Sequence, residues 1–325
     1  MAWDSVPWFT EGGAEHSSEV ARLLAYAAFG GAEGIVGSGD LQVRALSTPA
    51  AAVQVLPGAC AVTNRAPGSA YQSYAARLPV AEQVPIAATG VAARSDLIVA
   101  RVENPYSYGE TWPNPADPKV GPYVFTRVIS GVPKTTTSVR QIRSGDSAIP
   151  LARIDIPPNT STITQAMVTD LREMVSPRRD RRLYTGFPDD LSTLGYSDNQ
   201  WHNWPGPPAR WNIAVPLWAT QVKIITTLAG FRMTNANVYA SMQHSFGGIL
   251  GQDTDIDDDQ GRTTRRSTVV IADSFGIPAS MRGTVQPLFL QTYMHRSETG
   301  DVSVDGSTSI ICDIDFTEAP TAEER

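Results

Sequence analysis

The sequence predicts a mainly β protein with two domains. Charged residues make up only 18% of its 325 residues, while glycine and proline are frequent, at 26 and 24. Few charges and many turn-forming residues are typical of short strands joined by tight turns. Apolar and polar residues alternate in many short runs, and one segment alone has clear helical spacing. We therefore expect an N-terminal β-rich domain with one short helix, followed by a C-terminal β-sandwich or jelly-roll-like domain.

The predicted organisation has five parts. They are an N-terminal arm at 1–15, a β-rich domain at 16–175, a linker at 176–184, a β-sandwich domain at 185–318 and a tail at 319–325. The boundary is placed at the charged stretch Ser176–Arg182, which is typical of a solvated linker. The alternative is a basic patch for an acidic partner.

The arm is rich in aromatic residues and glycine. Trp3, Trp8 and Phe9 lie within its first nine residues. Exposed aromatic side chains usually need a surface to cover them. We expect the arm to contact a neighbouring subunit, and folding back on its own domain is the alternative.

One amphipathic helix is predicted next. Ser17, Ser18 and Glu19 provide its start, and Gly30 with Gly31 ends it. Its apolar positions follow the i, i+3, i+4, i+7, i+8 spacing and are Val20, Leu23, Leu24, Ala27 and Ala28. This narrow face is expected to pack on its own sheet, with a position along a symmetry axis as the alternative.

Strands are predicted through the rest of the first half. The alternating runs are 41–46, 52–56, 59–63, 94–102 and 123–130. The run 94–102 is the most regular, with Leu97, Val99 and the stretch 100–102 largely apolar, and is expected at the centre of its sheet. Between the last two, residues 103–122 carry too many prolines for a helix or a central strand. In this loop Tyr106, Tyr108 and Trp112 form a candidate contact surface, or else they cover their own sheet.

The stretch 148–174 ends the first domain. Its strand carries apolar Ile149, Leu151, Ile154 and Ile156, and Pro157-Pro158-Asn159 stops it. A short segment then leads to Thr169-Asp170-Leu171-Arg172. These residues include no nucleophile, metal cage or phosphate loop, so the stretch is interpreted as structural.

This stretch resembles the segment that closes the N-terminal domain of tail-tip and baseplate proteins of long-tailed bacteriophages. The residues that carry the resemblance are Leu151–Thr164 and Thr169–Arg172, and the upstream pieces Leu56–Val62 and Arg94–Val102 agree with it. The resemblance covers about the first half of the chain. It implies a minor tail protein, from a phage of an actinobacterial host. It also implies a homo-oligomer, namely a trimer, that contacts other tail proteins in the virion.

The second half begins with a group of tryptophans. Six strand-like runs follow, at 213–217, 221–228, 237–242, 267–272, 284–293 and 309–316, as expected for a β-sandwich. Trp201, His202, Trp204 and Trp211 form the candidate ligand site, because indole rings stack on sugars and nearby amides bond their hydroxyls. The alternative is that these tryptophans pack the base of the sandwich or a subunit interface.

An acidic run at 253–259 is the one candidate for a metal. Asp253, Asp255 and Asp257 begin like a calcium loop, but the EF-hand pattern fails, since Asp258 replaces the required glycine and Thr264 the required glutamate. A solvated acidic hairpin tip is favoured. The histidines, at 16, 202, 244 and 295, have no zinc-site spacing.

Composition excludes several other classes. The net charge is -7 without a long basic run, which disfavours a nucleic-acid partner. No apolar stretch approaches the roughly 20 residues that cross a bilayer, and the first residues do not resemble a signal peptide. We therefore expect assembly in the host cytoplasm and no membrane insertion. Cys60 and Cys312 are expected as buried free thiols.

No catalytic motif or cofactor fingerprint is found. Carboxylate pairs at Asp189-Asp190 and Asp313/Asp315 are the residues that a glycan hydrolase would use. We instead expect no enzyme and no cofactor. The sequence thus predicts a structural protein of the phage tail tip that assembles as a homo-oligomer and attaches to the host surface. The alternatives are a carbohydrate-binding receptor module and, less favoured, a tail-associated glycan hydrolase.

Overall fold

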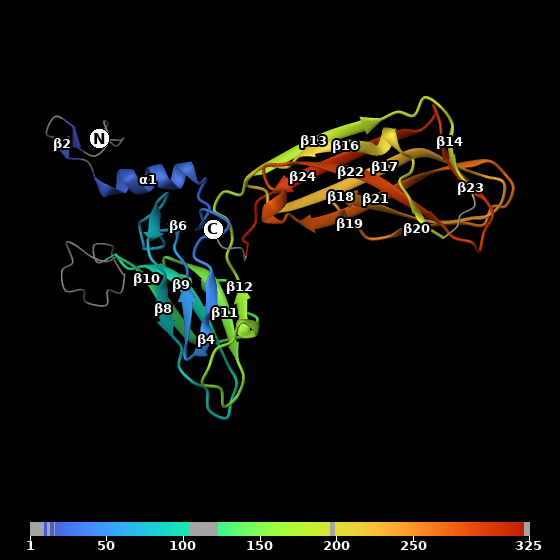
Figure 1. Ribbon diagram of the computed structural model, residues 1–325. Helices are drawn as coiled ribbons and strands as arrows, with labels where there is room; N and C mark the ends of the chain where they lie inside the picture. Colours follow the sequence, from blue (N-terminus) through green and yellow to red (C-terminus); the bar gives the residue numbers. More distant parts are fainter. Residues whose placement is uncertain (1–9, 12–13, 16, 105–122, 196–198, 322–325) are drawn as a thin grey trace. The chain divides into compact units, whose positions relative to one another are not determined.

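The computed structural model describes residues 10–11, 14–15, 17–104, 123–195 and 199–321. The predicted fold class is confirmed, since the described residues are mainly β and contain one α-helix. The chain divides into two compact units, Met1–Ser176 with Pro320–Arg325 (unit 1) and Pro177–Ala319 (unit 2). Figure 1 shows the sheets of each unit. The arm residues Trp3, Trp8 and Phe9 and the loop residues Tyr106, Tyr108 and Trp112 lie outside the described residues.

Unit 1 consists of small antiparallel sheets. Their orders are β10-β9-β11-β12, β3-β6-β7, β4-β5-β8 and the pair β1-β2. The elements are β1 (Thr10–Glu11), β2 (Ala14–Glu15), α1 (Ser18–Ala28), β3 (Gly34–Ile35), β4 (Val43–Ala50), β5 (Ala52–Val55), β6 (Gly58–Thr63), β7 (Ser73–Leu78), β8 (Glu82–Pro85), β9 (Arg94–Val102), β10 (Val124–Val132), β11 (Ala148–Ile156) and β12 (Val168–Asp170), with short 3-10 turns at Val139–Gln141 and Gln165–Met167.

Strand β9 is central in its sheet, as predicted, because apolar side chains cover both of its faces. Ile98 and Ala100 lie in the main core with residues of the two three-stranded sheets of unit 1. Leu97 and Val99 point the opposite way, into a smaller core. Such burial on both faces requires the near-continuous apolar run that the sequence shows.

Strand β11 contains a bulge that explains its irregular pattern. The register with β9 shifts between Pro150 and Ala152. A bulge adds one residue to one strand and so changes which face the following side chains occupy. As a result Leu151, Ala152 and Ile154 all lie in the same core.

The segment after β11 is held by one buried arginine. The Arg172 side chain is 0% exposed and pairs with Asp170, with Nη2 2.6 Å from Oδ2. Its other N–H groups donate to the carbonyls of Asp40, at 2.7 Å, and Thr321, at 3.0 Å. A buried guanidinium needs such partners for its donors. The resemblance-bearing residues Asp170 and Arg172 therefore join three distant segments of unit 1.

The predicted helix is confirmed, but its apolar face is largely uncovered. Helix α1 starts at the Ser17 cap, whose Oγ accepts the Glu19 N–H at 3.2 Å. Of the apolar positions, Val20 is buried, whereas Leu23 and Leu24 are 39% and 47% exposed. The expected packing of this face on its own sheet is therefore wrong for most of its length.

Longer side chains on another side of the helix make the contact instead. Tyr26 meets Tyr71 edge to face, with ring centroids 5.7 Å apart. Arg22 Nε donates to Gln72 Oε1 at 2.6 Å. Helix α1 is thus attached through partly polar contacts, which leaves its leucines free to meet another surface.

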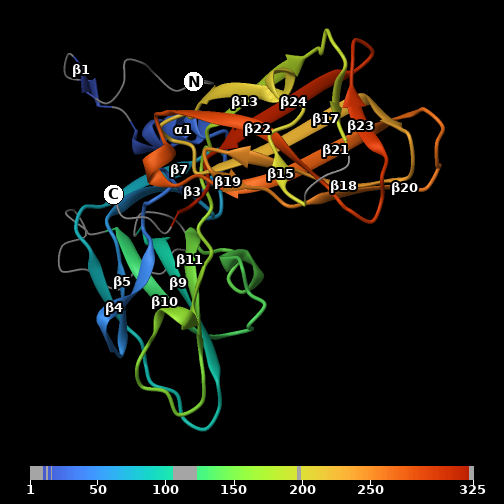
Figure 2. The same ribbon diagram turned by 45° about the vertical axis from the view of Figure 1, so that its right-hand side comes forward.

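Unit 2 is an antiparallel sandwich, seen as two layers in Figures 1 and 2. One layer, the β17 sheet, has the order β13-β24-β17-β23-β14 with β21 on β17, and the other, the β18 sheet, has the order β15-β22-β18-β19 with β16 on β22 and β20 on β18. The strands are β13 (Arg179–Gly186), β14 (Ser192–Leu194), β15 (Trp201–His202), β16 (Arg210–Ala214), β17 (Gln221–Thr234), β18 (Val238–Phe246), β19 (Ile249–Leu250), β20 (Thr254–Asp258), β21 (Arg265–Gly276), β22 (Val285–Met294), β23 (Asp301–Val304) and β24 (Ser309–Thr317), with 3-10 turns at Pro207–Ala209 and Ala279–Met281.

The two layers share their apolar core. Leu228 and Phe231 of β17 lie in one cluster with Met242 of β18 and Leu290 of β22. Alternate residues of each strand point into this core, as a sandwich requires. The remaining residues of the β18 sheet therefore form its outer face.

The predicted linker at 176–184 is wrong for most of its length, because Arg179–Gly186 forms strand β13. Two of its arginines pair with carboxylates on the neighbouring β24. Arg179 Nε donates to Asp315 Oδ1 at 2.8 Å, and Arg181 Nε to Asp313 Oδ1 at 2.9 Å. Charges that suggested a solvated linker are thus the outer positions of an edge strand, which charged side chains protect from further pairing.

Both cysteines are buried free thiols, as predicted. Burial raises the pKa of each thiol, Cys60 and Cys312, to about 12. Neither thiol is therefore a nucleophile near neutral pH. Among the described residues, no helix is both long and apolar enough to cross a membrane.

Candidate ligand-binding face

The outer face of the β18 sheet brings rings, amides and carboxylates together. Strands β22, β18 and β20 lie side by side and each carries polar or aromatic residues at alternate positions. The pairing register sets Tyr293 beside Ser241 and Ser241 beside Asp255. On an adjacent strand, Trp201 pairs with Tyr293. Paired residues point to the same side of a sheet, so this row forms one surface.

Two further rows lie on either side of it. In one, Gln291 pairs with Gln243, and Asp253 precedes β20. In the other, Tyr239 pairs with Asp257, and the His295 N–H donates to the Tyr239 carbonyl at 2.9 Å. We call this surface the aromatic face; it comprises Trp201, Asn203, Tyr239, Ser241, Gln243, Asp253, Asp255, Asp257, Gln291, Tyr293 and His295.

The rings of this face contact one another in a chain. Tyr239 and His295 are stacked, with centroids 4.0 Å apart and planes 16° apart. Tyr293 meets His295 at 4.7 Å and Trp201 at 5.6 Å. All four rings are half-buried. Each ring is therefore fixed by its neighbours yet keeps part of its surface accessible.

Hydrogen bonds hold the groups between the rings. The Ser241 hydroxyl donates to Asp255 Oδ1 at 2.6 Å, and its oxygen lies 2.9 Å from His295 Nε2. Because the serine has one hydrogen, which it gives to Asp255, His295 Nε2 must be the donor to Ser241. Ser241 is only 3% exposed, so this bond orients the imidazole and carboxylate and offers no accessible nucleophile.

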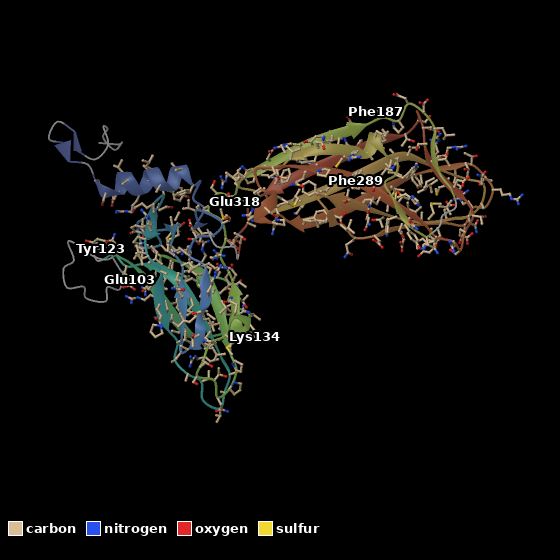
Figure 3. All side chains as sticks on the ribbon, in the orientation of Figure 1. Glu103, Tyr123, Lys134, Phe187, Phe289 and Glu318 are labelled. Carbon is tan, nitrogen blue, oxygen red and sulfur yellow. The ribbon has the colours of Figure 1, made fainter. Side chains whose placement is uncertain are left out.

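An amide chain fixes the next row. The side-chain amides of Gln243 and Gln291 contact each other at 3.0 Å, and Gln291 Nε2 donates to Asn203 Oδ1 at 3.0 Å. Asn203 is exposed. Phe289, two residues before Gln291, continues the same side of β22 (Figure 3). The amides are thus preoriented beside the rings, as in polar binding sites with few adjustable groups.

The acidic run is a strand rather than a loop. Asp255 and Asp257 are exposed on alternate positions of β20, while Asp258 points the other way and pairs with Arg265. The favoured prediction of a hairpin tip is therefore wrong for 254–258. A calcium site needs several carboxylates converging on one point. Within the described part of the chain no three His, Cys, Asp or Glu residues lie close enough to hold a metal.

The predicted tryptophan site is not assembled as expected. Only Trp201 lies on the aromatic face. Trp204 is 7% exposed in the core, where its indole N–H donates to Ser192 Oγ at 3.1 Å. Trp211 is partly buried against both core clusters of unit 2. His202, next to Trp201 in β15, points away from that face because strand side chains alternate.

Sequence reasoning missed most of the face, although three signals were present. They are the alternating triplets Tyr239-Ser241-Gln243, Gln291-Tyr293-His295 and Asp253-Asp255-Asp257. Each triplet shows which residues share a side of one strand, but none shows which strands are neighbours. The antiparallel pairing alone brings the three triplets together.

A second polar cluster is enclosed between the layers. His244 Nδ1 lies 2.6 Å from Asp273 Oδ2, and His244 Nε2 lies 2.8 Å from Thr226 Oγ1. Burial raises the pKa of Asp273, but the His244 bond and the Gln252 N–H outweigh it and leave the pKa below the usual range. Thr226 and His244 are both 0% exposed. A substrate has no access to this threonine, so the cluster is a core contact.

The candidate hydrolase pairs also lack the features of catalysis. The Arg181 guanidinium holds the pKa of Asp313 below its usual range, and Arg179 occupies Asp315. A glycosidase acid needs the opposite, a raised pKa. Asp189 and Asp190 are both exposed beyond the end of β13.

Comparisons with known proteins show only distant similarity. No family model matches the sequence, and no curated protein matches it. Among solved structures, a VP2 subviral particle of infectious bursal disease virus is 13% identical, with a TM-score of 0.27, covering 89% of this chain and 79% of that one. A mutant VP2 of the same virus, in T=1 particles, is 11% identical with a TM-score of 0.25, covering 94% and 84%. An insecticidal delta-endotoxin of Bacillus thuringiensis is 10% identical with a TM-score of 0.19, covering 88% and 51%.

These scores record a distant structural similarity to viral capsid proteins. They are too low to carry an argument about the function of this chain. Membership of a phage tail family stays a prediction from the sequence.

Proposed function

We propose that this chain is a structural component of a phage tail tip whose unit 2 binds saccharides of the host surface through the aromatic face. The observation that carries the binding role is the row of rings Trp201, Tyr293, His295 and Tyr239, flanked by fixed amides and carboxylates. Aromatic rings provide flat apolar surface for the C–H side of a sugar, and the amides and carboxylates accept and donate hydrogen bonds to its hydroxyls.

The assembly role is assigned to unit 1 and rests on helix α1. Its exposed Leu23 and Leu24 are four and three residues from Ala27, a spacing that forms a seam between helices. We assign this seam to a second copy of the chain, because exposed apolar side chains with this spacing on one helix pack well against the same side chains of a like helix. A homotrimer in the virion, which forms in the host cytoplasm and contacts other tail proteins, follows from the sequence resemblance.

The proposal includes no catalytic role. Leaving out a catalytic role is supported by the ion pairs of Asp313 and Asp315 and by the enclosure of Thr226. The resemblance-bearing segment supports a structural role, since its Arg172 joins segments of unit 1 through hydrogen bonds.

A glycan array probed with the full-length chain tests the binding role. We expect a saccharide ligand whose binding is lost in Trp201→Ala and in Tyr293→Ala. Phe187→Ala is the matched control, because Phe187 is 65% exposed just past the end of β13 (Figure 3) and lies on no strand of the β18 sheet. Binding that persists in both face variants, or no bound saccharide at all, would overturn the proposed binding role.

A further inference from the structure

The aromatic face carries a column of three carboxylates, and within the part of the chain that the structure describes none of them forms an ion pair. Asp255 and Asp257 occupy alternate positions of β20, so their Cα atoms are about 6.6 Å apart, and Asp253 directly precedes the strand. Asp255 accepts a hydrogen bond from Ser241, which leaves its charge in place. Asp257 and Asp255 are both exposed. Like charges at this spacing repel one another, so the column favours any cation that binds beside it.

Two of the three arginines in the following segment pair with other carboxylates. Arg265 pairs with Asp258, which points away from the face. Arg266 pairs with Asp305, with Nη2 2.5 Å from Oδ2. Within the described residues no ion pair reaches Asp255 or Asp257.

The stacked rings lie directly beside this column. Tyr239 pairs with Asp257 on the adjacent strand, at a separation of about 5 Å. A ring face attracts cations through its quadrupole, and the attraction adds to that of a neighbouring carboxylate. The Tyr239–His295 stack and Asp257 therefore favour the same kind of group, one that is flat on one side and cationic at its edge.

We infer that the face takes sugars that carry a free ammonium group, such as 2-amino sugars without the N-acetyl group, in preference to N-acetylated or acidic sugars. This inference rests on the proposed saccharide binding and names its ligand class. The pyranose stacks on the rings, and its ammonium group lies against Asp257 and Asp255. An N-acetyl group at that position carries no charge and leaves the carboxylates unpaired, while a carboxylated sugar is repelled.

Matched oligosaccharides test the inference. Short glucosamine oligomers and the corresponding N-acetylglucosamine oligomers differ only in the acetyl group. Isothermal titration of the full-length chain with each is expected to show about fivefold to tenfold tighter binding of the amine form, from one or two partly exposed charge contacts. This preference is expected to decrease as salt is added.

Variants separate the charge from the stacking. Asp257→Asn and Asp255→Asn should remove the preference, while Trp201→Ala should remove binding of both oligomers. Asp190→Asn is the control: it removes the same charge from an exposed residue outside the face. The affinity of this variant for both oligomers should stay unchanged. A general attraction of this chain, with net charge -7, for polycations would instead respond to any of the three substitutions.

The outcomes distinguish this inference from the proposed function. Equal binding of the two oligomers, or a preference that survives in both aspartate variants, would overturn the ammonium selectivity while saccharide binding through Trp201 remains. No binding of any saccharide would overturn the proposed binding role, and the inference with it.

Discussion

The two tryptophans Trp201 and Trp204 should respond to substitution in opposite ways. Trp204 is 7% exposed, packs edge to face on Phe231 at 6.1 Å and bonds Ser192. Replacing such a buried ring by alanine lowers the free energy of unfolding by about 3–5 kcal/mol, because apolar burial is lost and a cavity remains. For a domain of this size that lowers the Tm by about 10–15 °C. Because Trp201 is half-buried on the outer face, Trp201→Ala should lower the free energy of unfolding by less than about 1 kcal/mol.

Differential scanning fluorimetry of both alanine variants, followed by saccharide titration, checks this contrast. Trp201→Ala should keep its Tm and lose binding. Trp204→Phe, which retains most of the buried ring, should keep binding with a smaller loss of stability. The reasoning is refuted if Trp204→Ala keeps the wild-type Tm and loses binding, since Trp204 would then belong to the ligand site rather than the core.

Three more predictions concern the rest of the chain. Arg172→Met should destabilise unit 1 by about 2–4 kcal/mol, because it leaves Asp170 and two carbonyls without their donor; hydrogen exchange in β11 and β12 should rise, whereas the exposed-site control Arg140→Met should leave it unchanged. Leu24→Glu should lower the mass measured by light scattering to that of one chain, and an unchanged oligomer would remove α1 from the interface. The pKa of Asp273 is lowered in the folded state, so its carboxylate stabilises the fold above the unfolded pKa of about 3.9 and this contribution is lost as pH falls through the lower folded value. Asp273→Asn should therefore lower the Tm at pH 7 but make little difference at pH 2, and an equal loss at both pH values would contradict this.

Much of the fold could be predicted because local pattern determines it. The apolar run 94–102 identifies a central strand, and the Ser17 cap with its periodic leucines identifies α1. Alternation predicts strands without their partners, however. The local pattern of strand β13 predicts a linker, because Asp313 and Asp315, which neutralise its arginines, lie more than 130 residues further along the chain.

The candidate site was predictable only in part, for the same reason. Trp201 was identified, but Trp204 was grouped with it although it points into the core. The run Asp253–Asp259 suggested a loop, since aspartate is uncommon in strands. Asp255 and Asp257 instead lie on the outer side of strand β20, where Ser241 and Tyr239 are their cross-strand neighbours.

Hydroxyl-radical footprinting of the full-length chain with a saturating glucosamine oligomer tests the central claim most directly. Tryptophan, tyrosine and histidine are all readily oxidised, so a sugar bound on the aromatic face is detected as protection of these side chains from oxidation. We expect protection of Trp201, Tyr239, Tyr293 and His295, with Phe187 oxidised equally with and without the sugar. Protection that falls elsewhere on the chain, with these four rings unchanged, would contradict the assignment of the aromatic face as the saccharide site.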